Sequence, residues 1–339
     1  MTLRLKLSGV SVLVALLALA GCGGDGDEGS SGAGDELKVG LITDQGQLND
    51  RGFNELAFKG LKQAERDLGI EGRVIESATE ADYVPNITSL VRQDFDLIIG
   101  VGFAQGPAFD TAAGKFPDTK FVIIDVDQST LPHKPANVVG LLFKEEQVGY
   151  LAGYLAGLVE NRRPGKDVLG SVGGMKEPPV DRFIAGYQAG ARKAAPGATL
   201  LNGYSQDWED IAKCKELALN QIARGAQVVF QVAGGCGLGA LDAAKERGVW
   251  GIGVDADQSF LGPHVMTSAL KRVDQAVLQT IESVQDETWQ GGRNLTFGLA
   301  EDGVGLGTFS SRVPPGDRKA VDAIAKEIAA GKVQIPRAL

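Results

Sequence analysis

The sequence predicts an α/β fold made of two lobes, each a doubly wound parallel sheet. From Leu37 onward, short apolar runs that end in Gly, Asp or Ser alternate with amphipathic stretches of helical length. This alternation is typical of a parallel sheet with helices on both faces. It occurs in two similar halves, and a chain of 339 residues is long enough for two cores, because single cores stop growing near ~250–300 residues.

Each expected element follows from its own apolar pattern. The expected strands cover residues 37–43, 73–77, 96–102, 120–125, 137–143, 167–172, 198–204, 226–232 and 249–255. The expected helices cover residues 53–69, 83–94, 105–115, 145–160, 179–195, 209–224, 237–248 and 271–288. A last helix, expected at 317–331, returns to the second lobe.

Polar and proline-containing residues at 128–137 interrupt the alternation, as a crossing between domains would. A further segment starts again after Asp255. We therefore expect several crossings at a hinge. Lobe 1 is predicted to comprise residues 37–130 and 256–300, and lobe 2 residues 131–255 and 301–339.

The N-terminal residues predict export and anchoring. Residues 1–21 read as a signal peptide, because Arg4 and Lys6 precede an apolar run too short for the roughly 20 residues that span a bilayer. Leu-Ala-Gly-Cys at 19–22 resembles the bacterial lipobox, which places a lipid on Cys22. The alternative, a buried N-terminal helix, fits the charged start and the small residues poorly. We expect a lipid-anchored protein of the cell membrane that faces outside the cytoplasm.

Residues 22–36 are rich in Gly, Ser and acidic residues and contain almost nothing to bury, so they are predicted to form a flexible tether. The whole chain has 34 Lys and Arg against 43 Asp and Glu, a net charge of −9. Such a chain lacks the positive charge that a phosphate backbone requires. Nucleic acid is therefore not an expected partner.

The sequence offers no machinery for metal or nucleotide chemistry. Its histidines, His133 and His264, lie in unrelated contexts, and its three cysteines form no close pair. No phosphate-binding loop, dinucleotide fingerprint or G-x-S-x-G nucleophile motif occurs. We expect a protein that is not an enzyme and that holds neither a metal nor a cofactor.

Polar residues gather where the expected strands end. Asp44, Asp125 and Asp255 follow three of the apolar runs, and glycines follow others: Gly100, Gly102, Gly173, Gly174, Gly234 and Gly235. Each glycine alone is better explained by a turn. Ligands of open α/β sheets bind outside the carboxyl ends of the strands, so the coincidence favours one binding cleft.

Segment 43–61 (TDQGQLNDRGFNELAFKGL) resembles the opening of the basic membrane protein family of lipoproteins, which includes PnrA-type receptors for purine nucleosides. Further matches follow in order at 98–103, 121–127, 137–158, 169–190, 227–248, 251–258 and 267–274. The resemblance implies a type I periplasmic-binding-protein fold. It also implies that the partners are a small solute, with a nucleoside favoured, and the permease of an ABC importer.

The resemblance further implies which residues bind the ligand. They are Asp44, Phe53, Asn54, Asp125, Gly234, Gly235, Asp255 and Lys271. Asp44 and Asn54 match residues that hydrogen-bond the ligand, and Phe53 matches a ring that stacks on the base. Asp125 matches a carboxylate at the base edge.

On the sugar side, Asp255 matches an aspartate that holds the ribose hydroxyls, and Lys271 matches a lysine that reaches the sugar. Gly234 and Gly235 would bring backbone against the ligand. A second aromatic opposite Phe53 is not fixed by the resemblance. Phe183 and Trp208 are the candidates.

Structural alternatives stay open for several of these residues. Phe53 could pack in the core of the first helix, and Asp44 and Asn54 could serve turns and caps, as Asp50 is expected to do. Lys271 could be a solvated surface residue. A buried strand-end aspartate such as Asp255 is harder to explain without a partner or a ligand.

Cys236 stands in the glycine cluster, where family members often carry Thr, and Cys214 lies on the preceding expected helix. In an exported protein with Cys22 lipidated, these two cysteines form an even pair. A Cys214–Cys236 disulfide is therefore expected, with two free buried thiols as the alternative.

The favoured function is that of a lipid-anchored receptor that closes two lobes around a nucleoside, with a purine favoured. A sugar or another small polar solute remains an alternative, because stacking and paired carboxylates also suit a pyranose. A ligand-sensing subunit of a membrane signalling protein is a further alternative, because the sequence does not reveal the partner.

Overall fold

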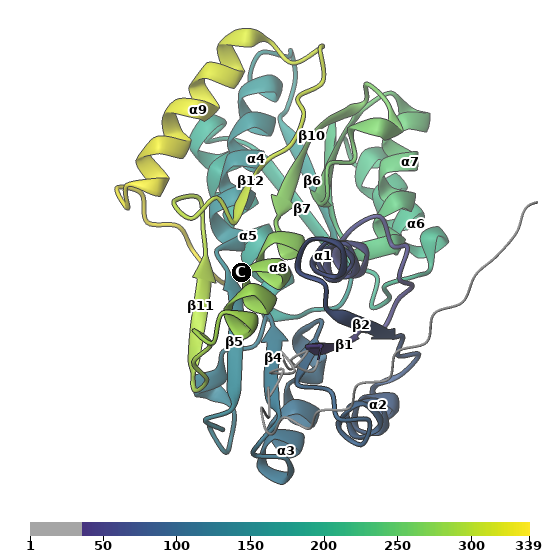
Figure 1. Cartoon of the computed structure of the whole chain (residues 1–339). Helices are drawn as coiled ribbons and strands as arrows, with labels where there is room; N and C mark the ends of the chain where they lie inside the picture. The colour runs from purple at the N-terminus through teal and green to yellow at the C-terminus, as the bar shows by residue number, and fades with distance from the viewer. Residues whose placement is uncertain (1–35) are drawn as a thin grey trace, which may run out of the picture. The chain divides into compact units, whose positions relative to one another are not determined.

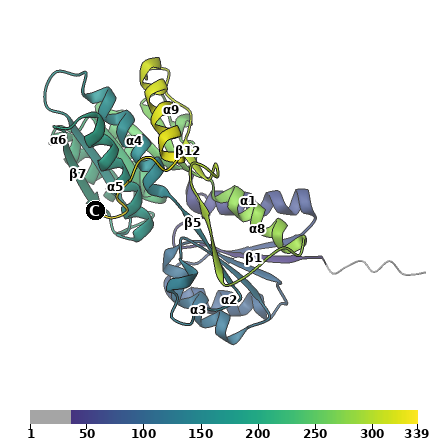
Figure 2. The same ribbon diagram turned by 90° about the vertical axis from the view of Figure 1, so that its left-hand side faces the viewer.

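The computed structural model describes residues 36–339, which form two α/β lobes, each built on a six-stranded sheet (Figures 1 and 2). The predicted signal peptide, Cys22 and the tether up to Asp35 lie outside the described residues. No helix of residues 36–339 has the length and apolar character that crossing a membrane requires. The α/β class and the two-lobe architecture are confirmed.

The strands, in chain order, are β1 (Lys38–Ile42), β2 (Glu71–Ile75), β3 (Leu97–Gly100), β4 (Lys120–Ile124), β5 (Val138–Phe143), β6 (Val168–Gly173), β7 (Thr199–Tyr204), β8 (Val228–Val232), β9 (Trp250–Asp255), β10 (Val265–Lys271), β11 (Arg293–Phe297) and β12 (Val304–Leu306). The helices are α1 (Phe53–Leu68), α2 (Tyr83–Val91), α3 (Gly106–Lys115), α4 (Glu145–Glu160), α5 (Pro178–Ala194), α6 (Ile211–Ala223), α7 (Gly237–Arg247), α8 (Val273–Gln285) and α9 (Pro315–Ala329).

The two sheets repeat one topology. The first has the strand order β11-β5-β4-β3-β1-β2, and the second has the order β12-β10-β9-β8-β6-β7. Neighbours in the first sheet pair in parallel, whereas β12 pairs antiparallel with β10. Strands β1 to β5 therefore correspond in position to strands β6 to β10, and the two similar halves of the sequence are two copies of one arrangement.

The lobe boundaries differ from the expected ones at both internal crossings. Strand β5 lies in the first sheet, although residues 131–255 were expected in lobe 2, and β10 lies in the second sheet, although 256–300 was expected in lobe 1. The polar segment before β5 is a loop of the first lobe. Its Asn137 side chain donates hydrogen bonds to three carbonyl oxygens around the end of α3.

Strands β10, β11 and β12 were not among the expected strands. Apolar and polar residues alternate only weakly along β11, because it is a partly exposed edge strand. Strand β12 has only 3 residues. Three crossings connect the lobes: β5 to α4, β10 to α8, and β11 to β12.

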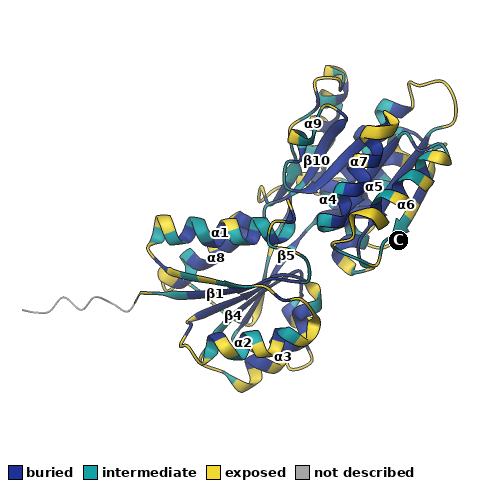
Figure 3. Cartoon of the chain, turned by 90° about the vertical axis from the view of Figure 1, so that its right-hand side faces the viewer, coloured by how far each residue is buried: buried dark blue, intermediate teal, exposed yellow. Residues whose placement is uncertain are grey.

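Apolar residues on both faces of the central strands build the core, as the dark blue strands in Figure 3 show. In the first lobe α1 packs beside α8 and α2 beside α3, and in the second α4 packs beside α5 and α6 beside α7 (Figures 1 and 2). Helix α9 packs on α4. The expected return of the last helix to the second lobe is therefore confirmed.

Glycines let α4 and α5 pack backbone against backbone. Gly149 and Gly153 on α4 face α5, and Gly186 and Gly190 on α5 face α4. A Cβ on Gly153 would clash with the carbonyl oxygen of Tyr187. The chain contains 47 glycines, about twice the ordinary share of ~7%. Helix interiors are a third place, besides the tether and the strand ends, where these glycines lie.

Gly153→Ala is expected to lower the free energy of unfolding by about 1–3 kcal/mol, because the added methyl overfills this contact. Urea denaturation measures the change. Gly114→Ala in α3 is the matched control, since a Cβ there meets open space and alanine favours a helix by up to about 1 kcal/mol over glycine. Equal effects of the two substitutions would contradict the close packing.

Candidate ligand-binding cleft

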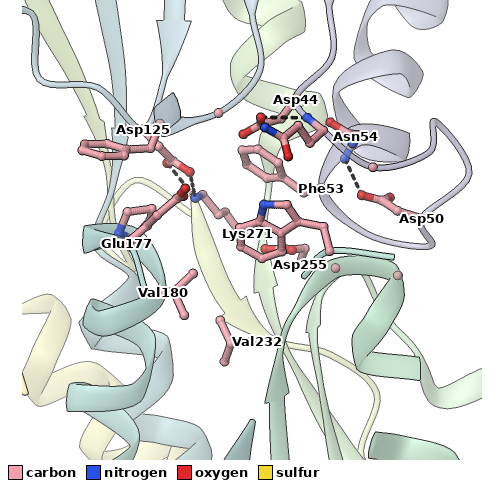
Figure 4. Close-up of a pocket in the computed structure, with 18 of the residues that line it drawn as sticks. Asp44, Asp50, Phe53, Asn54, Asp125, Glu177, Val180, Val232, Asp255 and Lys271 are labelled. Carbon is pink, nitrogen blue, oxygen red and sulfur yellow. Dashed lines mark hydrogen bonds and ion pairs between the residues drawn. The ribbon is translucent and has the colours of Figure 1, made fainter. Parts of the chain in front are cut away.

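A cavity lies at the carboxyl ends of strands from both sheets and has an empty volume of about 620 Å³ (Figure 4). It is lined by Asp44, Gln45, Gly46, Asp50, Phe53, Asn54, Gly102, Phe103, Asp125, Glu177, Pro179, Val180, Phe183, Trp208, Val232, Gly234, Gly235, Asp255 and Lys271. Every ligand-binding residue predicted above is among them.

The strand ends place the central side chains. Asp125 follows β4 directly, and Asp255 is the last residue of β9, the equivalent strand of the second lobe. Both adopt left-handed backbone conformations, with φ of 70° and 61°. Aspartate tolerates this region better than most residues, and such conformations are concentrated at functional sites.

Lys271 is the cation of the cavity and is only 2% exposed. Its Nζ lies 2.6 Å from both carboxylate oxygens of Asp125 and 3.0 Å from Oε1 of Glu145. Burial lowers the pKa of Lys271, but the charges of Asp125 and Glu145 outweigh it and hold the pKa above its ordinary value. Lys271 is therefore a buried, paired ammonium and not a surface residue.

This pairing bears on the role predicted for Asp125. Because Lys271 contacts both oxygens of Asp125, a ligand base would have to share that carboxylate with the lysine. Glu145 is also paired, since Nε of Arg182 donates to its Oε2 over 2.6 Å.

The ionic centre sits at the crossings between the lobes. Lys271 ends β10, and Glu145 begins α4, so two crossings meet there. Phe143 and Phe297, which end β5 and β11, stack with their ring centroids 5.2 Å apart. The Lys271 Nζ lies 5.0 Å from the centroid of Phe143. The three crossings therefore converge beside the cavity.

In the first lobe, Asp44 accepts hydrogen bonds from the Tyr83 hydroxyl, at 2.5 Å, and from the Gln45 amide, at 2.7 Å. Burial nevertheless raises the pKa of Asp44 to about 6. Asn54 is 3% exposed, and its Oδ1 has no hydrogen-bond partner among the described residues. It is an acceptor available to a ligand.

Asp50 lies three residues before α1 and caps its first turn, as its expected role requires. Its carboxylate accepts the backbone N–H groups of Gly52, Asn54 and Glu55. These bonds fix the first turn of the helix, which carries Phe53 and Asn54 into the cavity. The Phe53 ring also contacts Lys271, whose Nζ lies 4.9 Å from its centroid.

In the second lobe, no hydrogen bond or ion pair joins the Asp255 carboxylate to another described residue. Burial raises the pKa of Asp255 to about 7, against the lowering effect of Lys271. A carboxylate that is buried without a donor requires one from elsewhere. Asp255 is therefore the clearest unfilled acceptor of the cavity.

The aromatic residue that the second lobe offers is Trp208. Phe183 is 3% exposed and packs edge-on against Phe230 in the core. Trp208 is half-buried and packs over Gly174, where a side chain would clash with the indole ring. Of the two candidates for a second ring, Trp208 has the surface left to contact a ligand.

A disulfide joins Cys214 of α6 to Cys236 beside the glycine cluster, with Cα atoms 5.6 Å apart. The Cys236 amide also donates to the carbonyl oxygen of Trp208 over 2.8 Å. The bond thereby connects α6, the Trp208 loop and the cavity wall formed by Gly234 and Gly235.

Seven lining residues were not predicted, and they are Gln45, Gly46, Phe103, Glu177, Pro179, Val180 and Val232. Two of them, Phe103 and Glu177, are an aromatic ring and a carboxylate. Phe103 follows the glycines after β3, and Glu177 precedes α5. Both lie in segments that carried the family resemblance, but neither stands directly at the end of an apolar run. Within residues 36–339, no group of three or more His, Cys, Asp or Glu is placed to hold a metal ion.

Comparisons with known proteins agree with this geometry. Residues 37–338 match the family model described as Bmp, ABC transporter substrate-binding protein PnrA-like, a family of solute-binding proteins and not of enzymes. The ABC transporter nucleoside-binding protein BmpA of Lactococcus lactis is 31% identical over 89% of this chain and 89% of its own. An uncharacterized lipoprotein of Pyrococcus horikoshii is 34% identical over 90% of this chain and 77% of its own.

Among solved structures, an ABC transporter solute-binding protein of Aeropyrum pernix superposes with a TM-score of 0.80 at 25% identity. The match covers 88% of this chain and 92% of that one. The likeness confirms the expected type I periplasmic-binding-protein fold.

Lys271→Met is expected to lower the free energy of unfolding by about 3–5 kcal/mol, because it leaves buried carboxylates without their cation. Lys59→Met is the matched control. Lys59 contacts Asp274 at the same 2.6 Å, but its side chain is 62% exposed, and surface pairs contribute about 0–1 kcal/mol. Chemical denaturation compares the two, and equal losses would contradict the structural role of the buried pair.

The stability of the ligand-free protein is expected to fall as the pH rises from 3.8 to about 7, the unfolded and folded pKa values of Asp255. A raised pKa means that the folded protein keeps a proton that the unfolded chain releases. The stabilisation is therefore complete below the lower value and lost through the upper one, by at most about 1.4 kcal/mol per pH unit for one group.

Denaturation across this pH range tests the expectation. Asp255→Asn should make the decline shallower, whereas Asp67→Asn, an exposed position on α1, should leave it unchanged. A decline of the same slope in all three proteins would assign it to other groups.

Proposed function

Because the chain belongs to the Bmp family of PnrA-like ABC transporter substrate-binding proteins, we propose that it binds a nucleoside, with a purine favoured, and delivers it to the permease of an ABC importer. The observation that carries the proposal is the combination of aromatic rings from both lobes with unfilled acceptors in a single cavity. A relative that is named a nucleoside-binding protein supports it.

The base would lie between the aromatic side chains. Phe53 enters the cavity from the first lobe (Figure 4). Trp208 lines the cavity from the second lobe. Aromatic faces stack on any flat base, so this contact favours a nucleobase over an aliphatic solute without choosing among bases. Lys271 lies against the Phe53 ring, which leaves the other ring surface for the base.

The sugar would bind at Asp255. An ionised carboxylate only accepts hydrogen bonds, and its two oxygens can take two neighbouring O–H donors, such as a ribose diol. The Asp255 carboxylate has no donor from the described residues. A ligand that supplies donors favours the ionised form and offsets the cost of burying it.

Delivery to a permease would use the arrangement of the lobes. The two lobes contribute different groups to one cavity, so a ligand that contacts both stabilises the conformation in which both sets of groups reach it. The three crossings beside the cavity are where such a movement would be accommodated.

We further propose that the protein is exported and held at the membrane by a lipid on Cys22. The lipobox-like sequence Leu-Ala-Gly-Cys at 19–22 supports this. So does a relative that is named a lipoprotein.

Calorimetric titration with inosine is expected to show binding at a 1:1 ratio. Asp255→Asn should weaken it by about 10- to 150-fold, since hydrogen bonds to charged groups contribute about 1.5–3 kcal/mol. Asp67→Asn removes the same single negative charge, but Asp67 lies on the exposed surface of α1. This variant should bind inosine as the wild type does.

Thermal unfolding in the presence of nucleosides and of pyranose sugars separates the alternatives. At 100 times its dissociation constant, a bound nucleoside should stabilise the protein by about 2.7 kcal/mol. Stabilisation by a sugar and by no nucleoside would replace the proposal with sugar transport.

A further inference from the structure

The carboxylates of the cavity differ in whether the protein supplies their donors. Asp50 accepts backbone N–H groups, Asp44 accepts from Tyr83 and Gln45, and Asp125 is paired with Lys271. Among the lining residues, the side-chain carboxylates of Asp255 and Glu177 have neither a hydrogen bond nor an ion pair to another described residue. Asp255 is accounted for by the sugar, whereas Glu177 has no role so far.

Glu177 is held in place by the start of α5. It is the residue before Pro178, with an extended backbone, so the helix begins directly behind it. Figure 4 shows its side chain reaching from that helix toward Asp125. Burial and the negative charges of Asp44 and Asp125 raise the pKa of Glu177 to about 7. It therefore stands among the acids of the first lobe, although it belongs to the second.

This position is the end of the cavity assigned to the base. Asp125 is the residue matched to the base edge, but both of its oxygens contact the Lys271 ammonium. The neighbouring carboxylate that still lacks donors is Glu177. N–H donors on the ligand would favour the ionised form of Glu177, which accepts with both of its oxygens.

Nucleobases differ in how many such donors stand side by side. Guanine presents a ring N–H next to an amino group, which matches the two oxygens of one carboxylate, whereas hypoxanthine presents the ring N–H alone. Carboxylates recognise amino groups of bases in this way, and sites built to accept a donor reject analogues that lack it.

We propose that Glu177 is a specificity-determining residue that accepts two adjacent N–H donors of the base, so that the protein prefers guanosine to inosine. The inference rests on the nucleoside function proposed above.

Titration calorimetry with guanosine and inosine on the full-length protein tests it. The wild type is expected to bind guanosine on the order of 10-fold more tightly than inosine, the effect of one further hydrogen bond to a charged group. In Glu177→Ala this ratio should fall to about 1–2, because inosine loses one contact and guanosine loses both. Glu177→Gln preserves the shape, keeps one acceptor oxygen and should give an intermediate ratio.

Glu80→Gln is the control for charge alone. Glu80 is exposed and does not line the cavity, yet its charge also raises the pKa of Glu177. The substitution should leave the ratio at its wild-type value. Retained inosine binding by the Glu177 variants shows that they are folded.

The outcomes separate the two proposals. If the wild type binds both nucleosides equally, or if Glu177→Ala keeps the guanosine preference, the role of Glu177 is refuted while the nucleoside function stands. If the wild type binds neither nucleoside, the nucleoside function is refuted and this inference falls with it.

Discussion

The buried ion pair between Lys271 and Asp125 is the interaction on which the rest of the site depends. Removing an ammonium from water costs several kcal/mol, so Lys271 is stable only where carboxylates surround it. Those partners come from different parts of the fold, Asp125 from the end of β4 and Glu145 from the first turn of α4. The pairing thereby holds the first sheet against two of the crossings. Because Lys271 is engaged in this pairing, the remaining carboxylates of the cavity need donors other than this lysine, from the protein or from a ligand.

Repetition of one topology explains why the remaining groups meet. Strands β4 and β9 occupy equivalent positions in the two sheets, and each delivers an aspartate in the same left-handed conformation. The backbone therefore supplies a symmetric frame, and the side chains break the symmetry. Asp125 is neutralised by Lys271, whereas no donor among residues 36–339 contacts the carboxylate of Asp255. The two equivalent positions therefore differ in role. Asp125 maintains the structure, whereas the carboxylate of Asp255 is open to a ligand.

Local patterns made most of the elements and strand-end residues predictable, whereas pairing between distant segments did not. Apolar periodicity locates β5 but does not say which sheet this strand joins, and it did not locate β10 as a strand, so the lobe boundaries at these two strands were misplaced. The burial of Lys271 depends on a partner 146 residues away, which no local pattern reveals. Gly153 looks like any helical glycine until α5 is placed against it. Glu177 was missed because a charged residue at the start of a helix usually needs no further explanation.

On the proposed function, selectivity in this cavity would follow from the shortage of protein donors. Aromatic faces such as those of Phe53 and Trp208 stack on any flat ring, so stacking would contribute affinity and little discrimination. Discrimination would come from acceptors that the described residues leave without donors, which are the carboxylates of Asp255 and Glu177 and the buried Oδ1 of Asn54. A solute that places N–H or O–H groups at all three would satisfy them, whereas one that leaves a buried acceptor unpaired would lose about 1–3 kcal/mol for it. Such a cavity would select its solute chiefly by penalising the wrong ones.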